Sequence, residues 1–125
     1  MKTIAVVGAS NDRRKFGNKC VRAYLRAGWQ VFPININPAE KEVEGLPTRT
    51  SVRDIPEELE RISVYLPPPV TLELLPDFAA KGAREVWMNP GAADRAVIEA
   101  AKRQGIPVVE GCSIVDVGFS PSQFP

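Results

Sequence analysis

Short apolar runs alternate along the chain with longer segments in which apolar residues recur at helical spacing. Such runs are rich in β-branched residues and are typical of strands covered on both faces of a sheet. They predict strands over residues 4–7, 30–34, 62–66, 85–88 and 107–109. Pro33 has no N–H for a sheet hydrogen bond, so we expect it near a strand end or on an edge.

Helical spacing predicts helices over residues 16–25, 71–81 and 92–104, each followed closely by glycine, with a short helical turn within 51–60. Alternating strands and helices predict an α/β fold: a Rossmann-like, doubly wound parallel sheet of about five strands in three layers. The length suits one domain over residues 1–125. Residues 113–125 carry few helix or strand signals and are expected to form an irregular tail.

In a doubly wound sheet, ligands bind at the carboxyl ends of the strands, where the strand order switches direction. The first turn at that edge begins with Gly8, where backbone can approach a ligand closely. It lacks the dinucleotide-binding spacing, because Ser10 takes the place of the second glycine and Gly17 comes only after a longer loop. The turn still feeds a helix N-terminus, which favours anions, so it predicts a phosphate-binding site.

The same loop carries the positive charges of Arg13, Arg14 and Lys15. Hydrogen bonds between cations and phosphates are stronger than neutral ones, so these side chains would favour a ligand richer in phosphate than NAD. The alternative interpretation is a solvated basic loop beside an ordinary glycine turn. Glu40, Glu42 and Glu44 show no paired arrangement of the kind that acid–base chemistry needs and look like the solvated face of a loop.

The end of the second predicted strand argues against NAD. NAD-binding folds place Asp or Glu there to bind the ribose hydroxyls, whereas this chain has Asn35. NADP stays open as an alternative, although no Arg or Lys directly follows. Farther along, Pro67 and Pro69 form either a rigid apolar wall for a ligand or a plain strand stop. The segment that contains Asn89 and Gly91 either brings the backbone close to a ligand or forms an ordinary turn before a helix.

Composition narrows the function classes. The 16 Lys and Arg nearly balance the 15 Asp and Glu, so net charge does not indicate nucleic acid or a membrane surface as partner. The chain has no histidine, which excludes Ser-His-Asp and Cys-His catalysis and His-ligated metals within it. Cys20 and Cys112 are too few for a disulfide framework. With no secretory signal or membrane span in the pattern, we expect a cytoplasmic protein. Cys112 follows the last predicted strand, but no neighbour marks it as an activated thiol.

Several segments in fixed order resemble the small CoA-binding domain proteins. These are stand-alone relatives of the CoA-binding domain in the succinyl-CoA synthetase alpha subunit and NDP-forming acyl-CoA synthetases. The resemblance covers nearly the whole chain and rests on Ile4-Ala-Val-Val-Gly-Ala-Ser10, Lys15-Phe-Gly-Asn18, Gly28-Trp-Gln-Val-Phe-Pro33, Asn37-Pro38, Gly45, Asp54-Ile-Pro56, Leu66-Pro-Pro-Pro69, Val86-Trp-Met88, Pro90-Gly-Ala92, Gly105-Ile-Pro-Val-Val109 and Cys112. The ending Asn35-Ile-Asn-Pro38 is longer than is usual there, and the tail lacks a glutamate–histidine pair common in relatives.

The resemblance implies coenzyme A or an acyl-CoA in an extended groove, with no chemistry by this chain alone. Gly8, Ser10, Lys15 and Asn18 would meet the pyrophosphate. Asn35, Asn37 and Pro38 would lie near the adenosine end, and Pro67 and Pro69 would flank the adenine or the pantetheine arm. A homodimer and a catalytic partner subunit are the two partner arrangements it leaves open. No catalytic or metal-binding residue is predicted, and the expected cofactor-binding residues are Gly8, Ala9, Ser10, Arg13, Lys15, Phe16, Gly17, Asn18, Asn35, Asn37, Pro38, Pro67, Pro69, Asn89 and Gly91.

Overall fold

A computed structural model describes residues 1–125 and contains one five-stranded parallel sheet. Its spatial order is β2-β1-β5-β6-β7, so the chain leaves β1 for a neighbour on one side and then crosses to the other side. The strands are β1 Thr3–Val7, β2 Gln30–Ile34, β5 Arg61–Val64, β6 Glu85–Met88 and β7 Val108–Glu110. The five predicted strands and the doubly wound fold are therefore confirmed, and the order switches between β1 and β5.

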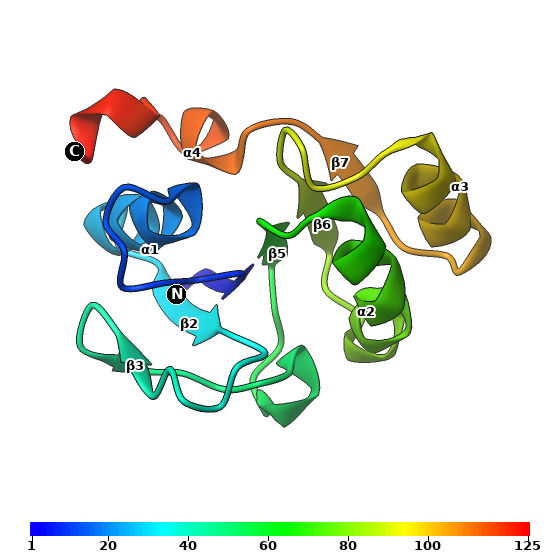
Figure 1. Ribbon diagram of the computed structural model, residues 1–125, viewed down its shortest axis with the longest axis horizontal. Helices are drawn as coiled ribbons and strands as arrows, with labels where there is room; N and C mark the ends of the chain where they lie inside the picture. The colour runs from blue at the N-terminus through cyan, green and yellow to red at the C-terminus, as the bar shows by residue number, and fades with distance from the viewer.

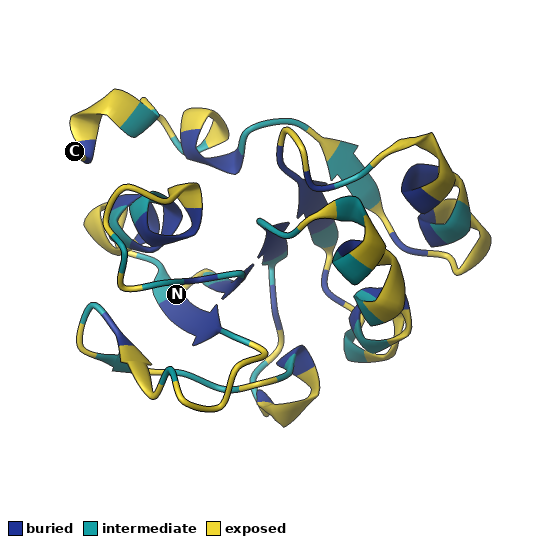
Figure 2. Ribbon diagram, viewed as in Figure 1, coloured by how far each residue is buried: buried dark blue, intermediate teal, exposed yellow.

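Helices cover both faces of this sheet (Figure 1). On one face, α2 and α3 pack in an apolar cluster of 19 buried residues, and on the other α1 packs in a cluster of 11. Figure 2 shows the buried strands between helices whose outer sides are exposed. The α-helices are α1 Phe16–Arg26, α2 Pro68–Lys81, α3 Arg95–Arg103 and the single-turn α4 Ser113–Asp116; 3-10 turns are η1 Val52–Asp54 and η2 Pro121–Gln123.

Two helices begin elsewhere than the spacing predicts. α2 starts at Pro68, three residues early, because a proline in the first helical turn lacks only an N–H that has no partner there. α3 starts at Arg95, three residues late, because the Asp94 side chain accepts a hydrogen bond from the N–H of Val97 and caps the helix. Pro33 lies on the edge strand β2, as predicted.

The loop after β2 contains a two-stranded hairpin, formed by β3 Glu42–Val43 and β4 Leu46–Pro47. Its Val43 is fully buried in the α1 cluster, so the hairpin is packed onto the domain. In Figure 1 the hairpin lies on the same side of the molecule as the loop that leads into α1.

The expectation of an irregular tail over residues 113–125 is wrong for part of it. α4 and η2 form there, and both Ile114 and Phe124 are buried against the α1 layer. Arg22 in α1 donates a hydrogen bond of 3.0 Å to the carbonyl of Phe124. Elements of three or four residues are too short to produce a recognisable apolar period, so the sequence pattern could not reveal them.

Tyr24 joins α1 to α4, and its burial makes the free energy of unfolding fall at alkaline pH. Its hydroxyl donates to the carbonyl of Ser113 at 2.8 Å and accepts from Arg61 at 2.9 Å. Burial raises the pKa of Tyr24 to about 12, above the value of about 10 for an exposed tyrosine. Since the folded state disfavours the ionised phenol, the stability that Tyr24 confers is complete below about pH 10 and is lost as the pH rises towards about 12.

We therefore expect the free energy of unfolding to fall less steeply between about pH 9.5 and 11.5 in Tyr24→Phe than in the unchanged protein. Urea titrations at half-unit steps across this range measure both slopes. Equal slopes would show that Tyr24 ionises alike in the folded and unfolded chains.

Candidate functional site

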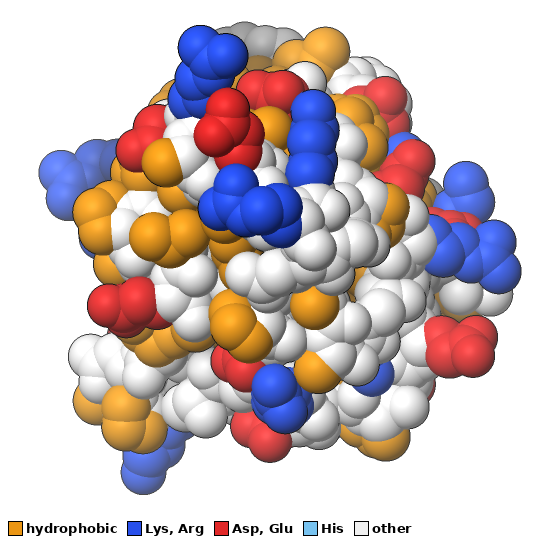
Figure 3. Space-filling model, turned by 90° about the vertical axis from the view of Figure 1, so that its right-hand side faces the viewer, with side chains coloured by type: hydrophobic (Ala, Val, Ile, Leu, Met, Phe, Trp, Pro, Cys, Tyr) orange, Lys and Arg blue, Asp and Glu red, His pale blue; other side chains and the backbone are white.

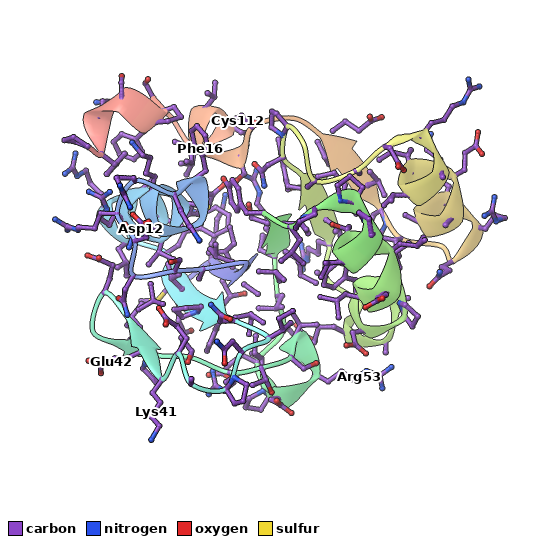
Figure 4. The ribbon with its side chains drawn as sticks, in the orientation of Figure 1. Asp12, Phe16, Lys41, Glu42, Arg53 and Cys112 are labelled. Carbon is purple, nitrogen blue, oxygen red and sulfur yellow. The ribbon has the colours of Figure 1, made fainter.

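A groove of about 560 Å³ lies across the carboxyl ends of the central strands, at the switch point between β1 and β5. Its lining includes the first residues of α1 and the residue that precedes α2; Figure 4 labels Phe16, the first residue of α1. Its walls combine backbone of glycine turns, one cation and several apolar side chains. The lining residues are Gly8, Lys15, Phe16, Gly17, Asn35, Ile36, Tyr65, Leu66, Pro67, Pro90, Gly91 and Ala92.

Two glycines bring the first turn into direct contact with its neighbours. Gly8 has a φ of 91°, and a Cβ there would overlap the carbonyl oxygen of Tyr65 at the end of β5. A Cβ on Gly17, in the first turn of α1, would overlap the carbonyl oxygen of Gly8. Three backbone segments therefore meet at one corner of the groove, which exposes backbone to a ligand.

The α1 N-terminus supplies the positive end of the groove. No side chain caps the helix, and its first two residues, Phe16 and Gly17, line the groove. The N–H groups of a first helical turn lack partners inside the helix and attract anions. Lys15 precedes the helix, lines the groove and takes part in no ion pair.

The two arginines of the loop lie outside the groove and are paired with carboxylates. Arg13 contacts Glu44 at 3.0 Å, and hydrogen bonds from Arg13 and Asn18 hold the pKa of Glu44 below its usual range. Arg14 contacts Asp12 at 3.0 Å and lowers the pKa of that carboxyl to about 2. Of the three basic residues, only Lys15 faces the groove.

Ala9, Ser10 and Asn18 also lie outside the lining and serve as the framework of the loop. Asn18 is fully buried, and its amide nitrogen donates to the carbonyl of Ser10 at 2.8 Å. The Ser10 hydroxyl accepts from the N–H of Asp12 at 3.0 Å. The amide of Asn18 is therefore occupied within the protein, since its oxygen also accepts a hydrogen bond from Arg22 at 2.7 Å.

Beyond β2, Asn35 lines the groove while Asn37 and Pro38 are exposed outside it. The Asn35 amide donates to the carbonyl of Ala9 at 2.9 Å, and its oxygen accepts from the N–H of Asn37 at 2.8 Å. Asn35 thus ties the end of β2 to the glycine turn. No carboxylate takes the position where NAD-binding folds carry their ribose-binding acid.

At the ends of β5 and β6, Pro67 and Gly91 line the groove, whereas Pro69 does not. Asn89 is buried beneath it: its amide nitrogen donates to Ser63 Oγ at 2.8 Å, and its oxygen accepts from the N–H of Ser113 at 2.9 Å. Asn89 therefore joins β5, β6 and α4, and its amide makes its hydrogen bonds inside the protein.

Five lining residues were absent from the sequence prediction. Four of them directly adjoin predicted site residues in the sequence: Ile36, Leu66, Pro90 and Ala92. The fifth, Tyr65, directly follows β5, which is the one signal that could have revealed it. Burial raises the pKa of Tyr65, so its hydroxyl stays neutral, 3.4 Å from Ser113 Oγ.

Other kinds of site find little support. No group of three or more Cys, Asp or Glu is arranged to hold a metal ion. No helix is both long enough and apolar enough to cross a bilayer. On the face in Figure 3, Lys and Arg lie among Asp and Glu, so neither sign of charge dominates it. Cys20 and Cys112 are free thiols, and burial raises the pKa of Cys20.

The doubly wound sheet, with a glycine turn and an uncapped helix beside one groove, defines a Rossmann-like α/β domain with a candidate ligand site at the switch point. Residues 2–118 match the family model described as the CoA binding domain. The chain belongs to this CoA-binding domain family.

Curated relatives are the alpha subunits of two ADP-forming acetate–CoA ligases of Pyrococcus furiosus. The subunit of ligase II is 35% identical over 84 residues, or 66% of this chain and 18% of that protein. The subunit of ligase I is 24% identical over 98% of this chain and 29% of its own length. The chain thus spans less than a third of either relative.

Solved structures share the fold over most of the chain. A conserved hypothetical protein from Pyrococcus furiosus has a TM-score of 0.83 and 30% identity, covering 93% of this chain and 99% of its own. The apo form of a dinucleotide-forming acetyl-coenzyme A synthetase from Ca. Korarchaeum cryptofilum has a TM-score of 0.74 and 26% identity, covering 86% of this chain and 25% of its own. The domain therefore occurs both in chains of about this size and within a much larger synthetase.

Proposed function

We propose that this protein binds coenzyme A or an acyl-CoA in the groove at the carboxyl ends of its strands and does no chemistry alone. The observation that carries the proposal is the composition of the groove in a chain of the CoA-binding family. One end offers Lys15 and the uncapped α1 N-terminus, and the walls beyond are apolar. CoA has the matching chemistry, because it joins a pyrophosphate to an apolar adenine ring and a flexible pantetheine arm.

In this arrangement Lys15 and the N–H groups of Phe16 and Gly17 bind the pyrophosphate. The backbone of Gly8 and Gly91 allows the ligand to lie close to the sheet edge. The remaining wall residues pack against the adenine and the pantetheine arm: Ile36, Tyr65, Leu66, Pro67, Pro90 and Ala92. The framework side chains, including Asn18 and Asn89, hold these walls in place without contacting the ligand.

The proposed role is that of a carrier, sensor or partner subunit in the cytoplasm. It is supported by the absence of histidine from the chain and by relatives in which a similar segment is part of a ligase subunit. A second copy of this chain and a separate catalytic subunit are the two candidate partners.

Calorimetric titration with CoA, acetyl-CoA, NAD and NADP tests the proposal. We expect CoA or acetyl-CoA to bind more tightly than either nicotinamide cofactor, because the end of β2 carries Asn35 and no carboxylate. Tight binding of NAD or NADP without binding of CoA would refute the proposal and favour a nicotinamide-dependent oxidoreductase. Native mass spectrometry of freshly purified protein would reveal a co-purifying cofactor by its mass.

Lys15→Glu should weaken CoA binding by more than tenfold, or about 1.4 kcal/mol. The change removes the one cation that lines the groove and places a carboxylate beside the pyrophosphate. Arg14→Glu is the matched control, because it changes the net charge by the same amount at the neighbouring position. The Arg14 side chain is 90% exposed and lies outside the groove. Equal effects of the two variants would mean that long-range charge, and not a contact from Lys15, governs affinity.

A further inference from the structure

The turn of the β3–β4 hairpin has an unfavourable residue for its conformation. Glu44 and Gly45 form the two-residue turn and have φ values of 48° and 77°, both in the left-handed region. Glycine and asparagine suit that region, whereas a glutamate there is strained. Glu44 is the one non-glycine residue of the chain with a positive φ. Backbone strain that persists in a fold is a reason to look for a function of the residue that bears it.

The Glu44 side chain reaches from the hairpin to the loop between β1 and α1. Its carboxylate accepts two hydrogen bonds from Arg13, from Nη2 at 3.0 Å and from Nε at 3.3 Å. It accepts a third from the buried amide of Asn18, at 3.0 Å. The Glu44 side chain is 19% exposed, so solvent competes for these bonds less than at an open surface pair.

Three further hydrogen bonds join the hairpin region to the same loop, and all of them involve Asn11. The Asn11 side chain donates to the carbonyl of Glu42 at 2.6 Å and accepts from the N–H of Glu44 at 3.3 Å. The backbone N–H of Asn11 donates to the carboxylate of Glu40 at 3.1 Å. Of the three glutamates that look like a solvated face in the sequence, Glu40 and Glu44 therefore contact the other loop through their carboxylates, whereas Glu42 is exposed and contributes only its backbone carbonyl.

Arg13 and Asn18 stand on either side of the segment that lines the groove. Lys15, Phe16 and Gly17 lie between them in sequence, whereas Arg13, Asn18 and Glu44 themselves do not line the groove. Because the Glu44 carboxylate binds both Arg13 and Asn18, it restricts the positions that Lys15 and the first N–H groups of α1 can adopt. Holding such groups in place before a ligand arrives lowers the entropic cost of binding.

We propose that Glu44 is a positioning residue that holds the β1–α1 loop in its ligand-binding shape by binding Arg13 and Asn18. The inference rests on the proposed function insofar as the ligand is CoA. Glu44 does not touch the ligand in this arrangement and acts through the loop. Glycine or asparagine would relieve the strain at φ 48° but would carry no carboxylate to pair with Arg13.

Glu44→Asn separates positioning from ordinary stability. Asparagine suits the left-handed turn, which offsets part of the cost of losing the Arg13 pair and one hydrogen bond of buried Asn18, so urea unfolding should stay cooperative with a midpoint only modestly lower. In the ligand-free variant, the amides of Asn11, Arg14 and Lys15 should exchange hydrogen at least tenfold faster. CoA affinity measured by calorimetry should fall at least fivefold.

Arg13→Gln should reproduce the loss of CoA affinity, and the double variant Arg13→Gln/Glu44→Asn should be no weaker than either single variant. Glu99→Gln, which breaks the exposed Arg95–Glu99 pair on α3, is the control and should change neither exchange nor affinity. Unchanged loop exchange in Glu44→Asn would overturn the inference whether or not CoA binds. If the unchanged protein binds no CoA, the proposed function fails separately.

Discussion

Replacing Gly8 with alanine should lower the free energy of unfolding by about 2–5 kcal/mol, summing about 1–2 for the left-handed backbone and about 1–3 for overpacking. Two independent costs fall on this residue. Its φ of 91° disfavours any side chain, and a Cβ would overlap the backbone carbonyl oxygen of Tyr65. Backbone in the middle of the sheet has little freedom to move aside, so a small shift cannot relieve the overlap. Urea denaturation followed by circular dichroism measures the change.

Gly105→Ala isolates the first cost from the second. Gly105 has a φ of 74°, but a Cβ there would have no heavy atom within 4 Å. We therefore expect this control to lose only about 1–2 kcal/mol. If both variants lose the same stability, the contact between the first turn and β5 is looser than the structure indicates. Variants that remain folded at 10 °C should also bind CoA more weakly, because this turn is one corner of the groove.

Asn89→Asp should destabilise the fold by about 3–5 kcal/mol at neutral pH, the range for an uncompensated buried charge. The aspartate has almost the same shape as asparagine but loses both N–H donors. One of its oxygens would then face the carbonyl of Val64, which now accepts from the Asn89 amide at 3.0 Å. Asn89 is 2% exposed, so water cannot replace the lost partner.

The matched control is Asn37→Asp. Asn37 is exposed, and its side-chain oxygen accepts from the N–H of Ala39 at 3.1 Å, a role that a carboxylate fills equally well. We expect a change of no more than about 0.5 kcal/mol in this variant. Thermal unfolding at pH 7 compares the two. A small effect at Asn89 would mean that α4 and the ends of β5 and β6 can separate at little cost.

The element order could be predicted because it depends on local features. Apolar runs, helical spacing and terminal glycines lie within a few residues of one another, so each strand and long helix leaves its own signal. The boundaries depended on capping: Pro68 and Asp94 moved two helix starts by three residues each. The one-turn α4 was missed because four residues span barely one helical period, which leaves no room for apolar positions to recur.

The candidate site was predictable in position but only partly in composition. The carboxyl edge, Gly8, Lys15 and Gly91 follow from strand order and turn chemistry. Asn18, which the family resemblance implies at the pyrophosphate, lies outside the groove lining and hydrogen-bonds to Ser10 and Glu44. Residue type alone could not reveal this, because an asparagine can serve a ligand or the protein equally well.

By itself, the sequence determined the doubly wound α/β fold and the edge of the sheet at which the candidate groove lies, because hydrophobic periodicity is a local property. Only the tertiary structure decided which polar side chains face that groove and which find partners inside the protein. Asn18 and Glu44 are 26 residues apart, and Asn89 and Ser113 are 24 apart, yet each pair is hydrogen-bonded. Such partners meet only when the chain is folded, and a side chain that has found its partner inside the protein is no longer available to a ligand.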